Sequence, residues 1–433
     1  MKKLNTSPIS GMQELLPQEQ AIFNNYKETI REVYRKHGFL EIETPMIDRA
    51  EILFAKAGGE TEKQIYKVVK TDETAEDADQ ALRFDHTVPL ARYVAEHESN
   101  LNFPFKVTQI GRNFRGERAQ KGRFREFYQC DIDVLGRNEL AIEYDAEVIL
   151  TLIDTLSALK LPKMLVRISN RKILAGFLEE LNLQEVAKEI SGIIDHAEKV
   201  APEKVKEWLS ELQIGDERVA EVLQFIGLAG TREEVVAKLR EFGFENEKFN
   251  EGAAELEKVL KILEGQGLSD AVVADMKIVR GLDYYTGTVF ETILPDYKEI
   301  GSICSGGRYE NLAELYTDQK FPGVGGSIGL TRLFYVLNEY NLVQAEESDR
   351  KRYAIVPFSN SEAEVAFAYK VAAKFRGRGK DADVIFLEKK LGDKIGFAAK
   401  TADYLVVVGE NEVKTGAFKV KNLATGETAD SEV

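Results

Sequence analysis

The chain has 433 residues, which is more than one hydrophobic core usually serves, so its length predicts two or three domains. It carries 58 Lys and Arg against 73 Asp and Glu, a net charge of −15, which argues against nonspecific affinity for nucleic acid because the phosphates would be repelled. The start, MKKLNTSPISGMQELLP, has no apolar stretch behind its lysines, and no run of roughly 18 apolar residues occurs, so we expect a soluble, cytoplasmic protein with no membrane partner.

Cysteine and histidine are too sparse to suggest a structural metal site or a disulfide framework. Cys130 and Cys304 lie far apart without a CxxC spacing, and the four histidines are scattered along the chain. We therefore expect reduced, structural cysteines and assign no residue as a metal ligand.

The first third of the chain begins with a helix and continues in strands. Residues 18–37 place apolar side chains at helical spacing and stop at Gly38, a typical C-terminal glycine. The strand-like FLEIETPMI (39–47) follows, and the acidic run TDETAEDADQ (71–80) is most simply a solvated hairpin loop. Next, FKVTQIGRNFR and FREFYQCDIDVLG alternate on a two-residue period around the loop GERAQKG, so they predict an antiparallel hairpin with a basic loop.

Side chains of this hairpin suit a nucleotide. Along a strand Arg115 and Glu117 would point to one side, as would Arg125, Phe127 and Gln129. A guanidinium suits phosphate, an aromatic ring suits base stacking, and a carboxylate can accept from an exocyclic amine. A salt-bridged hairpin on a wet sheet is the alternative explanation of this segment taken alone.

Helical and strand patterns continue to residue 340. Residues 138–160 and 171–264 have helical patterns, and the latter range, rich in Glu, Lys and Leu, predicts a helical insertion. Strand patterns return in 276–294 and 299–312, and 323–340 has the pattern of a strand, a glycine turn and a helix. No internal repeat is evident.

The C-terminal segment differs in charge from the rest. From residue 349 onward there are 15 Lys and Arg against 13 Asp and Glu, whereas the first 348 residues have 43 against 60. Behind the linker LVQAEESDRKR, the short apolar runs YAIVPF, DADVIFL and YLVVVG are separated by helical segments, which predicts a small α/β domain.

Three further segments combine glycines with arginines or tyrosines. VRGLDYYTGTVFE (279–291) holds Arg280 and a tyrosine pair, with glycines that permit close approach of a ligand or backbone. SGGRYENL (305–312) and GGSIGLTRL (325–333) each place glycines before an arginine. Any one of these is weak evidence, but together with the basic hairpin they favour a ligand site.

These motifs resemble the class II aminoacyl-tRNA synthetases. GFLEIETPMI is similar to motif 1, FRGE with GRFREFYQ to motif 2, and GSIGLTRL to motif 3. Within the class, GMQELLP, LRFDHTVPLARY, RGLDYYTGTVFE and SGGRYENL resemble the histidyl-tRNA synthetases, and the tail is similar to the anticodon-binding domain shared by the histidyl, glycyl, threonyl and prolyl enzymes. The resemblance covers nearly the whole chain.

The resemblance implies an α+β class II synthetase catalytic core, an antiparallel sheet flanked by helices, with a helical insertion and a C-terminal α/β anticodon-binding domain. The expected bounds are a core over 1–170 and 265–340, an insertion over 171–264, a linker over 341–350 and the anticodon-binding domain over 351–433. The implied reaction is ATP-dependent ligation of histidine to tRNA(His) through a histidyl-adenylate, with release of AMP and pyrophosphate. Mg²⁺ would accompany ATP, and motif 1 would form a homodimer.

Residue roles also follow from the resemblance. The implied catalytic residues are Arg115, Arg280 and Arg332. The implied ATP-binding residues are Arg115 at the α-phosphate, Glu117 at the adenine amine, Phe127 stacked on the ring and Arg332 at the far phosphates. The implied histidine-binding residues are Asp85, Gln129 and Thr87 at the α-ammonium, Asp133 and Tyr285 at the imidazole nitrogens, and Tyr284 and Tyr309 in the pocket wall.

For tRNA, the hairpin loop is expected to meet the acceptor end through Arg118, Gln120 and Lys121. The tail offers basic candidates for the anticodon stem, namely Arg350, Lys351, Arg352, Arg376, Arg378, Lys389 and Lys390.

Two residues depart from the family's usual pattern. Thr331 stands where an acidic residue is common before the motif 3 arginine, and His86 stands where leucine or glycine is common. A binding protein is the main rival interpretation, because the regulatory subunit of ATP phosphoribosyltransferase resembles this catalytic domain. The arginine set and the tail argue against that reading, and Asp133 with the tyrosine pair argues against a synthetase for another amino acid.

Overall fold

The computed structural model divides the chain into two compact units, residues 1–344 and residues 345–433. It describes residues 3–54, 62–72, 74, 78–279, 284–310, 312–343 and 351–432. Arg280, Arg350 and part of the acidic run over 71–80 therefore lie outside the described residues.

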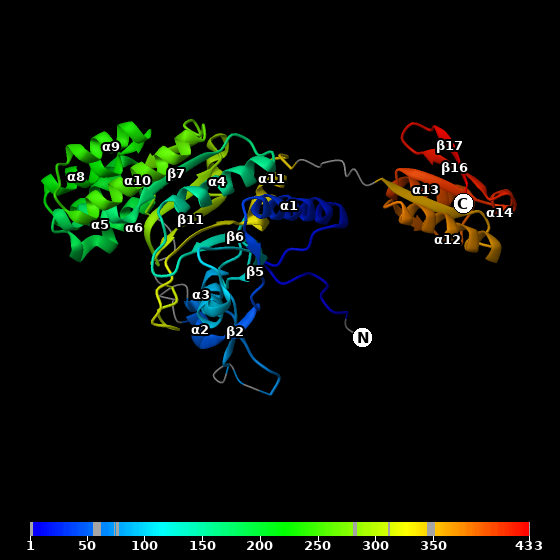
Figure 1. The fold of residues 1–433 in the computed structure, drawn as a ribbon, viewed down its shortest axis with the longest axis horizontal. Helices are drawn as coiled ribbons and strands as arrows, with labels where there is room; N and C mark the ends of the chain where they lie inside the picture. Colours follow the sequence, from blue (N-terminus) through cyan, green and yellow to red (C-terminus); the bar gives the residue numbers. More distant parts are fainter. Residues whose placement is uncertain are drawn as a thin grey trace. The chain divides into compact units, whose positions relative to one another are not determined.

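A nine-stranded sheet forms the centre of the first unit (Figure 1). In spatial order its strands are β1 (Leu40–Glu41), β5 (Phe105–Phe114), β6 (Glu126–Leu135), β12 (Gly323–Ile328), β11 (Cys304–Tyr309), β10 (Tyr285–Ile293), β7 (Leu165–Asn170), β9 (Val272–Asp275) and β8 (Ala229–Gly230). Neighbouring strands are antiparallel except in the pairs β1–β5 and β7–β9. The predicted antiparallel sheet is confirmed, with parallel pairing added near both ends.

A second, three-stranded sheet precedes β5 in the chain. Its strands in spatial order are β2 (Ile47–Arg49), β4 (Gln80–Leu82) and β3 (Lys67–Val68). In the chain, α2 (Ala50–Phe54) follows β2 directly and α3 (Thr87–His97) follows β4. The single strand expected over 39–47 is wrong, because this segment splits into β1 and β2 in different sheets. Pro45 lies between them and has no N–H to donate to a strand ladder.

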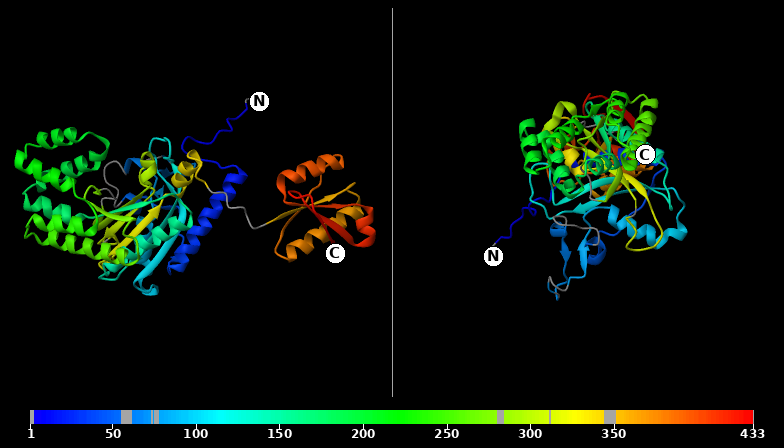
Figure 2. Two further views of the ribbon diagram at one scale, coloured as in Figure 1. Left: turned by 90° about the horizontal axis from the view of Figure 1, so that it is seen from above. Right: turned by 90° about the vertical axis from the view of Figure 1, so that its left-hand side faces the viewer.

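Three helices cover one face of the central sheet (Figure 2). They are α1 (Pro17–Lys36), α4 (Glu143–Ala158) and α11 (Leu330–Glu339). α1 ends beside Gly38, which has a φ of 81° and so takes the left-handed conformation that a C-terminal glycine permits. The apolar residues Cys130, Ile132 and Val134 of β6 are fully buried in this layer.

Most of the remaining helices gather beside β7 and β9 (Figures 1 and 2). They are α5 (Arg171–Glu180), α6 (Ala187–His196), α7 (Pro202–Glu211), α8 (Asp216–Ile226), α9 (Arg232–Glu241) and α10 (Glu247–Gly265). Short 3₁₀ helices lie at Glu62–Gln64, Glu98–Asn100, Gln184–Val186, Ala197–Lys199 and Pro295–Ile300. The buried side chains of this helical segment join the same hydrophobic core as the central sheet. The chain's single tryptophan, Trp208, is half-buried in α7 with the Lys204 ammonium 5.8 Å from its ring centroid.

The second unit is a small α/β fold. Its sheet runs in the order β14 (Asp381–Val384), β13 (Arg352–Pro357), β15 (Tyr404–Val408), β16 (Ala417–Asn422) and β17 (Thr428–Glu432), and its helices are α12 (Glu362–Gly377), α13 (Leu391–Thr401) and α14 (Glu410–Thr415). The three strands predicted from sequence are parallel neighbours, and β16 and β17 add an antiparallel edge that was not predicted. No described helix of either unit is long and apolar enough to cross a membrane.

A buried ion cluster ties the helical segment to the central sheet. Arg167 on β7 has only 7% of its side chain exposed and donates from Nε to Asp275 Oδ2 at 2.9 Å and from Nη1 to Glu291 Oε1 at 2.9 Å. It also pairs with Glu198, which lies in the 3₁₀ helix after α6. One guanidinium thus connects three strands with the helical segment.

Arg167→Met should destabilise the protein by about 3 kcal/mol, because removal of one partner leaves the buried Asp275 carboxylate without its counter-ion. Chemical denaturation followed by circular dichroism measures the change. The exposed pair of Arg35 with Glu32 provides the matched control, since Arg35→Met removes a solvent-screened ion pair and should leave the midpoint unchanged. Equal midpoints for Arg167→Met and the wild type would contradict the inferred role of the cluster.

Candidate active site

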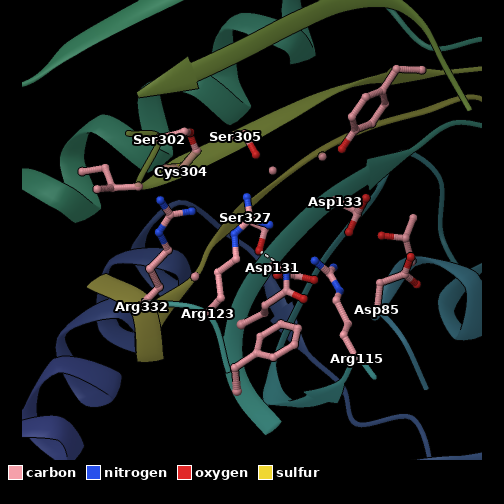
Figure 3. A pocket seen from close by; sticks show the side chains of 18 of the residues that line it. Asp85, Arg115, Arg123, Asp131, Asp133, Ser302, Cys304, Ser305, Ser327 and Arg332 are labelled. Carbon is pink, nitrogen blue, oxygen red and sulfur yellow. Dashed lines mark hydrogen bonds between the residues drawn. The ribbon is translucent and has the colours of Figure 1, made fainter. Parts of the chain in front are cut away.

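A cavity of about 450 Å³ opens on the face of the central sheet opposite α1 and α4 (Figure 3). It is lined by every residue predicted to bind histidine or ATP that the structure describes, namely Asp85, Thr87, Arg115, Glu117, Phe127, Gln129, Asp133, Tyr284, Tyr285, Tyr309 and Arg332. Segments more than 200 residues apart in the chain supply these side chains, and strand pairing brings them together. Arg280 lies outside the described residues.

Strand β6 provides the floor of the cavity. Its residues alternate, so that Gln129, Asp131 and Asp133 line the cavity while the residues between them pack in the core. The neighbouring strand β12 has a glycine, Gly325, opposite Asp133. A Cβ at this position would overlap the Asp133 carboxylate. The Gln129 amide is fixed on both sides, with Oε1 accepting from Asn113 at 2.8 Å and Nε2 donating to Ser327 Oγ at 2.7 Å.

The tyrosine-lined end of the cavity holds Asp133 in a defined orientation. Tyr309 donates its hydroxyl to Asp133 Oδ1 at 3.0 Å, and the rings of Tyr284 and Tyr309 meet edge to face at 6.0 Å. Burial raises the pKa of Asp133 well above its usual range, and the neighbouring Asp131 carboxylate raises it further. Burial likewise raises the pKa of Tyr285, so its hydroxyl remains a hydrogen-bond donor at neutral pH.

Asp85 lies at the start of α3. Its Oδ1 accepts from the backbone N–H of Val88 at 3.0 Å, which satisfies one of the free donors at this helix end. Burial raises the pKa of Asp85, and the hydrogen bond from Val88 and the charge of Arg115 oppose that rise.

Arg332 and Arg123 line the opposite end of the cavity, whereas Arg115 lies nearer the middle, beside Asp85 (Figure 3). Arg115 donates from Nε to the carbonyl of Phe84 at 3.3 Å, and its guanidinium lies 4.3 Å from the Phe84 ring centroid and 5.0 Å from that of Phe127. Arg332 donates to the carbonyl of Ile300 at 2.7 Å. Burial, and then the nearby charge of Arg123, lowers the pKa of Arg332.

The predicted strand positions of the arginine and carboxylate in motif 2 are wrong. β5 ends at Phe114, so Arg115 and Glu117 follow the strand rather than extend it, although both still line the cavity. Arg125 precedes β6 and turns away, donating to the carbonyl of Glu117 at 3.0 Å instead of sharing a face with Phe127. Beyond Arg115 the chain leaves the ladder, because the backbone N–H of Gly116 donates to the carbonyl of Gln64 at 2.7 Å instead of to the other strand.

Several residues that line the cavity were not predicted from the sequence. Arg123 pairs with Glu117 at 3.4 Å beside the arginine end, and Asp131 and Ser327 lie on the floor. The two-residue period of β6 could have found Asp131, because it lies between two residues that were assigned. Ser327 could be placed only by the pairing of β12 with β6.

The predicted tRNA-contacting residues lie on the loop between β5 and β6 and do not line the cavity. Arg118, Gln120 and Lys121 are all exposed, and Lys121 Nζ lies 3.3 Å from Glu339 on α11. Thr331 stands where an acidic residue is common in the family, and its contacts show how the site does without that carboxylate. Its hydroxyl accepts from the backbone N–H of Tyr128 at 2.8 Å, which fixes the start of α11 beside β6 without a carboxylate.

A mostly antiparallel sheet carrying such a cavity, in one chain with a small α/β unit, is the architecture of the class II aminoacyl-tRNA synthetases. The profile of the family described as histidyl-tRNA synthetase matches residues 11–333, and that of an anticodon binding domain matches residues 353–433. The chain belongs to the histidyl-tRNA synthetase family. The family's activity, ATP-dependent ligation of histidine to tRNA through an aminoacyl-adenylate, is therefore its activity.

Individual relatives agree with this assignment. The histidine–tRNA ligase of Clostridium tetani is 46% identical over 98% of this chain and 96% of its own length. The crystal structure of histidyl-tRNA synthetase from Nostoc sp. PCC 7120 is 36% identical, with a TM-score of 0.86 over 99% of this chain and 97% of that one.

A structure from Bacillus halodurans, described as an ATP phosphoribosyltransferase regulatory subunit/histidyl-tRNA synthetase, is 21% identical. Its TM-score is 0.76 over 94% of this chain and 99% of that one, a likeness of fold alone. The fold therefore does not separate the enzyme from the rival regulatory protein, whereas the identity to histidine–tRNA ligases favours the enzyme.

Asp133→Asn should stabilise the ligand-free protein at pH 7.5, raising the midpoint of thermal unfolding by about 2 °C. The pKa of the Asp133 carboxyl is higher in the folded protein than in the unfolded chain. The contribution of this carboxyl to the free energy of unfolding is therefore highest below its pKa in the unfolded chain, and it falls as the pH rises through its pKa in the folded protein. The gain of the variant should therefore shrink as the pH falls toward 4.

The exposed Asp270 offers a control, and Asp270→Asn should leave the midpoint at pH 7.5 unchanged. A lower midpoint for Asp133→Asn at pH 7.5 would mean that the ionised carboxylate is stabilising in the fold.

Proposed function

We propose that the cavity activates histidine by bringing its carboxylate to the α-phosphate of ATP, and that the resulting histidyl-adenylate is then consumed by tRNA(His). The observation that carries this proposal is the shared cavity, in which tyrosines and carboxylates occupy one end, Arg332 and Arg123 the other, and Arg115 the middle. A ligand pair with a cationic amino acid at one end and polyphosphate at the other matches that distribution of charge.

At the tyrosine end, Asp133 and Tyr285 would read the imidazole ring. A neutral imidazole has one N–H donor and one acceptor nitrogen, which a carboxylate and a phenol hydroxyl can satisfy together. Tyr309 supports this role because its hydrogen bond fixes the Asp133 carboxylate. An amino acid without both ring nitrogens would leave these buried groups unpaired. We therefore expect the site to favour histidine over such amino acids by on the order of 10⁴-fold. Tyr284 would close the wall beside the ring.

The α-ammonium of histidine would lie at Asp85, with Thr87 and Gln129 beside it. One oxygen of Asp85 accepts from the backbone N–H of Val88. The contacts that the structure describes leave its second oxygen available to a ligand. Gln129 is locked between Asn113 and Ser327, so its carbonyl oxygen keeps one lone pair for a donor.

At the arginine end, the task is to bring two anions together, so charge neutralisation and alignment matter more than proton transfer. Arg115 would hold the α-phosphate and Arg332 the far phosphates, with Glu117 and Phe127 at the adenine. Arg280 would bridge the reacting carboxylate and the α-phosphate. An arginine suits these positions because it keeps its charge even when buried and can grip two oxygens at once.

Mg²⁺ would enter with ATP rather than occupy a site of its own. No group of three or more His, Cys, Asp or Glu among the described residues is arranged to hold a metal ion. Mg²⁺ is commonly bound through one or two carboxylates and substrate phosphates, so this finding agrees with a metal carried by the nucleotide.

The second substrate, tRNA(His), would be held at two places. The exposed loop residues Arg118, Gln120 and Lys121 would meet the acceptor end, and the second unit would bind the anticodon stem. A homodimer formed through residues 39–47 and a cytoplasmic location complete the proposal. The exposed apolar side chains of Leu40, Met46 and Ile47 support a dimer contact in that segment.

Histidine-dependent exchange of pyrophosphate into ATP tests the activation step. We expect exchange with histidine alone among the amino acids, and a loss of at least about 100-fold in kcat for Arg115→Ala or Arg280→Ala with unchanged circular dichroism. Normal exchange in either variant would remove that arginine from the mechanism.

Charging of tRNA tests the loop separately from the cavity. The double change of Arg118 and Lys121 to alanine should leave pyrophosphate exchange unchanged and raise the KM for tRNA(His) about tenfold, because it removes two exposed cations that would contact phosphates. The double change of Lys188 in α6 and Lys206 in α7 to alanine provides the control, because both positions are exposed and the same number of positive charges is removed. Unchanged charging by the loop variant would place the acceptor end elsewhere.

A further inference from the structure

A buried histidine–carboxylate pair lies directly against the cavity and has no role in the proposal so far. His86 follows Asp85 at the start of α3, and Asp131 lies on β6 between Gln129 and Asp133. His86 is fully buried and Asp131 is 5% exposed, and the ring Nδ1 lies 2.9 Å from Asp131 Oδ2. The pair thus joins the element that carries Asp85 to the strand that carries the other polar floor residues.

The surroundings hold this pair in one position. Gly111 on β5 has no side chain, and a Cβ there would lie 3.1 Å from His86 Nε2 and 2.6 Å from Arg83 Nη2, so the ring and the guanidinium fill that space. The backbone of His86 accepts from Gln109 Nε2 at 3.2 Å. The charged groups that interact with the Asp131 carboxylate include Arg83, Asp85, Arg115 and Asp133.

One carboxylate oxygen of Asp131 lacks a hydrogen-bond donor. Asp131 Oδ2 is engaged by His86, whereas Oδ1 is buried and has no hydrogen-bond partner among the described residues. A buried carboxylate oxygen without a donor costs free energy, and such atoms in native proteins usually meet a donor that arrives with a ligand or water. Asp131 lines the cavity, so a ligand in the cavity can supply that donor.

The donor that fits is an ammonium group. An ammonium carries three N–H groups. Asp85 and Gln129 each offer it one remaining acceptor, because Asp85 has one oxygen committed to Val88 and the Gln129 oxygen already accepts from Asn113. The third N–H can go to the Thr87 hydroxyl or to Asp131 Oδ1. Asp131 lies beside Gln129 on the same face of β6, and its buried Oδ1 has no donor among the described residues, so an N–H of the ligand satisfies it. Neither the imidazole nor the phosphates require a further acceptor at this place.

We propose that Asp131 is a substrate-binding residue that accepts a hydrogen bond from the α-ammonium of histidine through Oδ1. His86 is a positioning residue that holds the carboxylate by its other oxygen. This assignment rests on the proposed location of the ammonium beside Asp85 and Gln129. It also gives the unusual histidine between Asp85 and Thr87 a function that the rest of the site does not require.

Calorimetric binding of two ligands tests the role of Asp131. Histidine carries the ammonium, and 3-(imidazol-4-yl)propionate has the same ring and carboxylate without it. Asp131→Asn keeps the shape of the side chain and should weaken histidine about 10- to 100-fold, the loss expected for a hydrogen bond to a charged group, with no weakening of the propionate. Equal weakening of both ligands, or of neither, would overturn the proposal.

Asp85→Asn separates this inference from the proposed function. If Asp85→Asn weakens histidine selectively and Asp131→Asn does not, the ammonium site stands and only the role of Asp131 falls. If Asp85→Asn has no selective effect, the ammonium does not lie at this end of the cavity and the proposed site itself is wrong.

The role of His86 requires a double-variant cycle. His86→Gln should weaken histidine by a few-fold in the wild type and have no further effect in the Asp131→Asn background, since it acts through that carboxylate. An additive loss would contradict positioning through Asp131. The pair of His37 with Asp154, at 3.0 Å and outside the cavity lining, is the matched control, and His37→Gln should leave both affinities unchanged. Asp131→Asn alone still decides the carboxylate's role if a His86 variant fails to fold.

Discussion

The pairing of β5 with β6 is the constraint on which the site depends. The two strands pair antiparallel over their whole lengths, with Gln129 opposite Gly111 and Asp133 opposite Val107. Because side chains alternate along a strand, a slip of one residue would bury the polar floor residues in the core and turn the apolar ones toward the ligand. The apolar residues between them are fully buried against α1 and α4, so burial of that face fixes the register that the chemistry needs.

The same arrangement makes the empty cavity electrostatically unfavourable. Asp85, Asp131 and Asp133 are all nearly buried, and the charge of Asp131 raises the pKa values of both neighbours. The glycines of β11 and β12 allow this crowding, since side chains there would occupy the space of Asp133 and Tyr285. A cationic substrate group relieves the repulsion, so part of the binding free energy comes from charges that the fold has already brought together at a cost in stability.

Much of this organisation could be predicted from local sequence patterns. The two-residue period around the basic loop specified the hairpin, and the motifs identified the side chains that the cavity collects. The missed features depend on longer-range contacts. β16 pairs with the predicted strand β15, and β17 pairs with β16. Ser327 reaches Gln129 only through the pairing of β12 with β6, and Arg123 meets Glu117 only after the loop turns. Pro45, which has no N–H to donate to a strand ladder, lies between the two strands into which 39–47 divides, and the apolar pattern concealed this local signal.

The position of the single tryptophan has an optical consequence. Trp208 lies in α7, within the helical segment tied to the sheet by Arg167, whereas the aromatic residues of the cavity are phenylalanines and tyrosines. Selective tryptophan emission therefore comes from the helical segment alone, without any substitution or label. A change in that emission when tRNA is added would belong to this segment, and a change in tyrosine emission when histidine is added would have its nearest sources in the cavity.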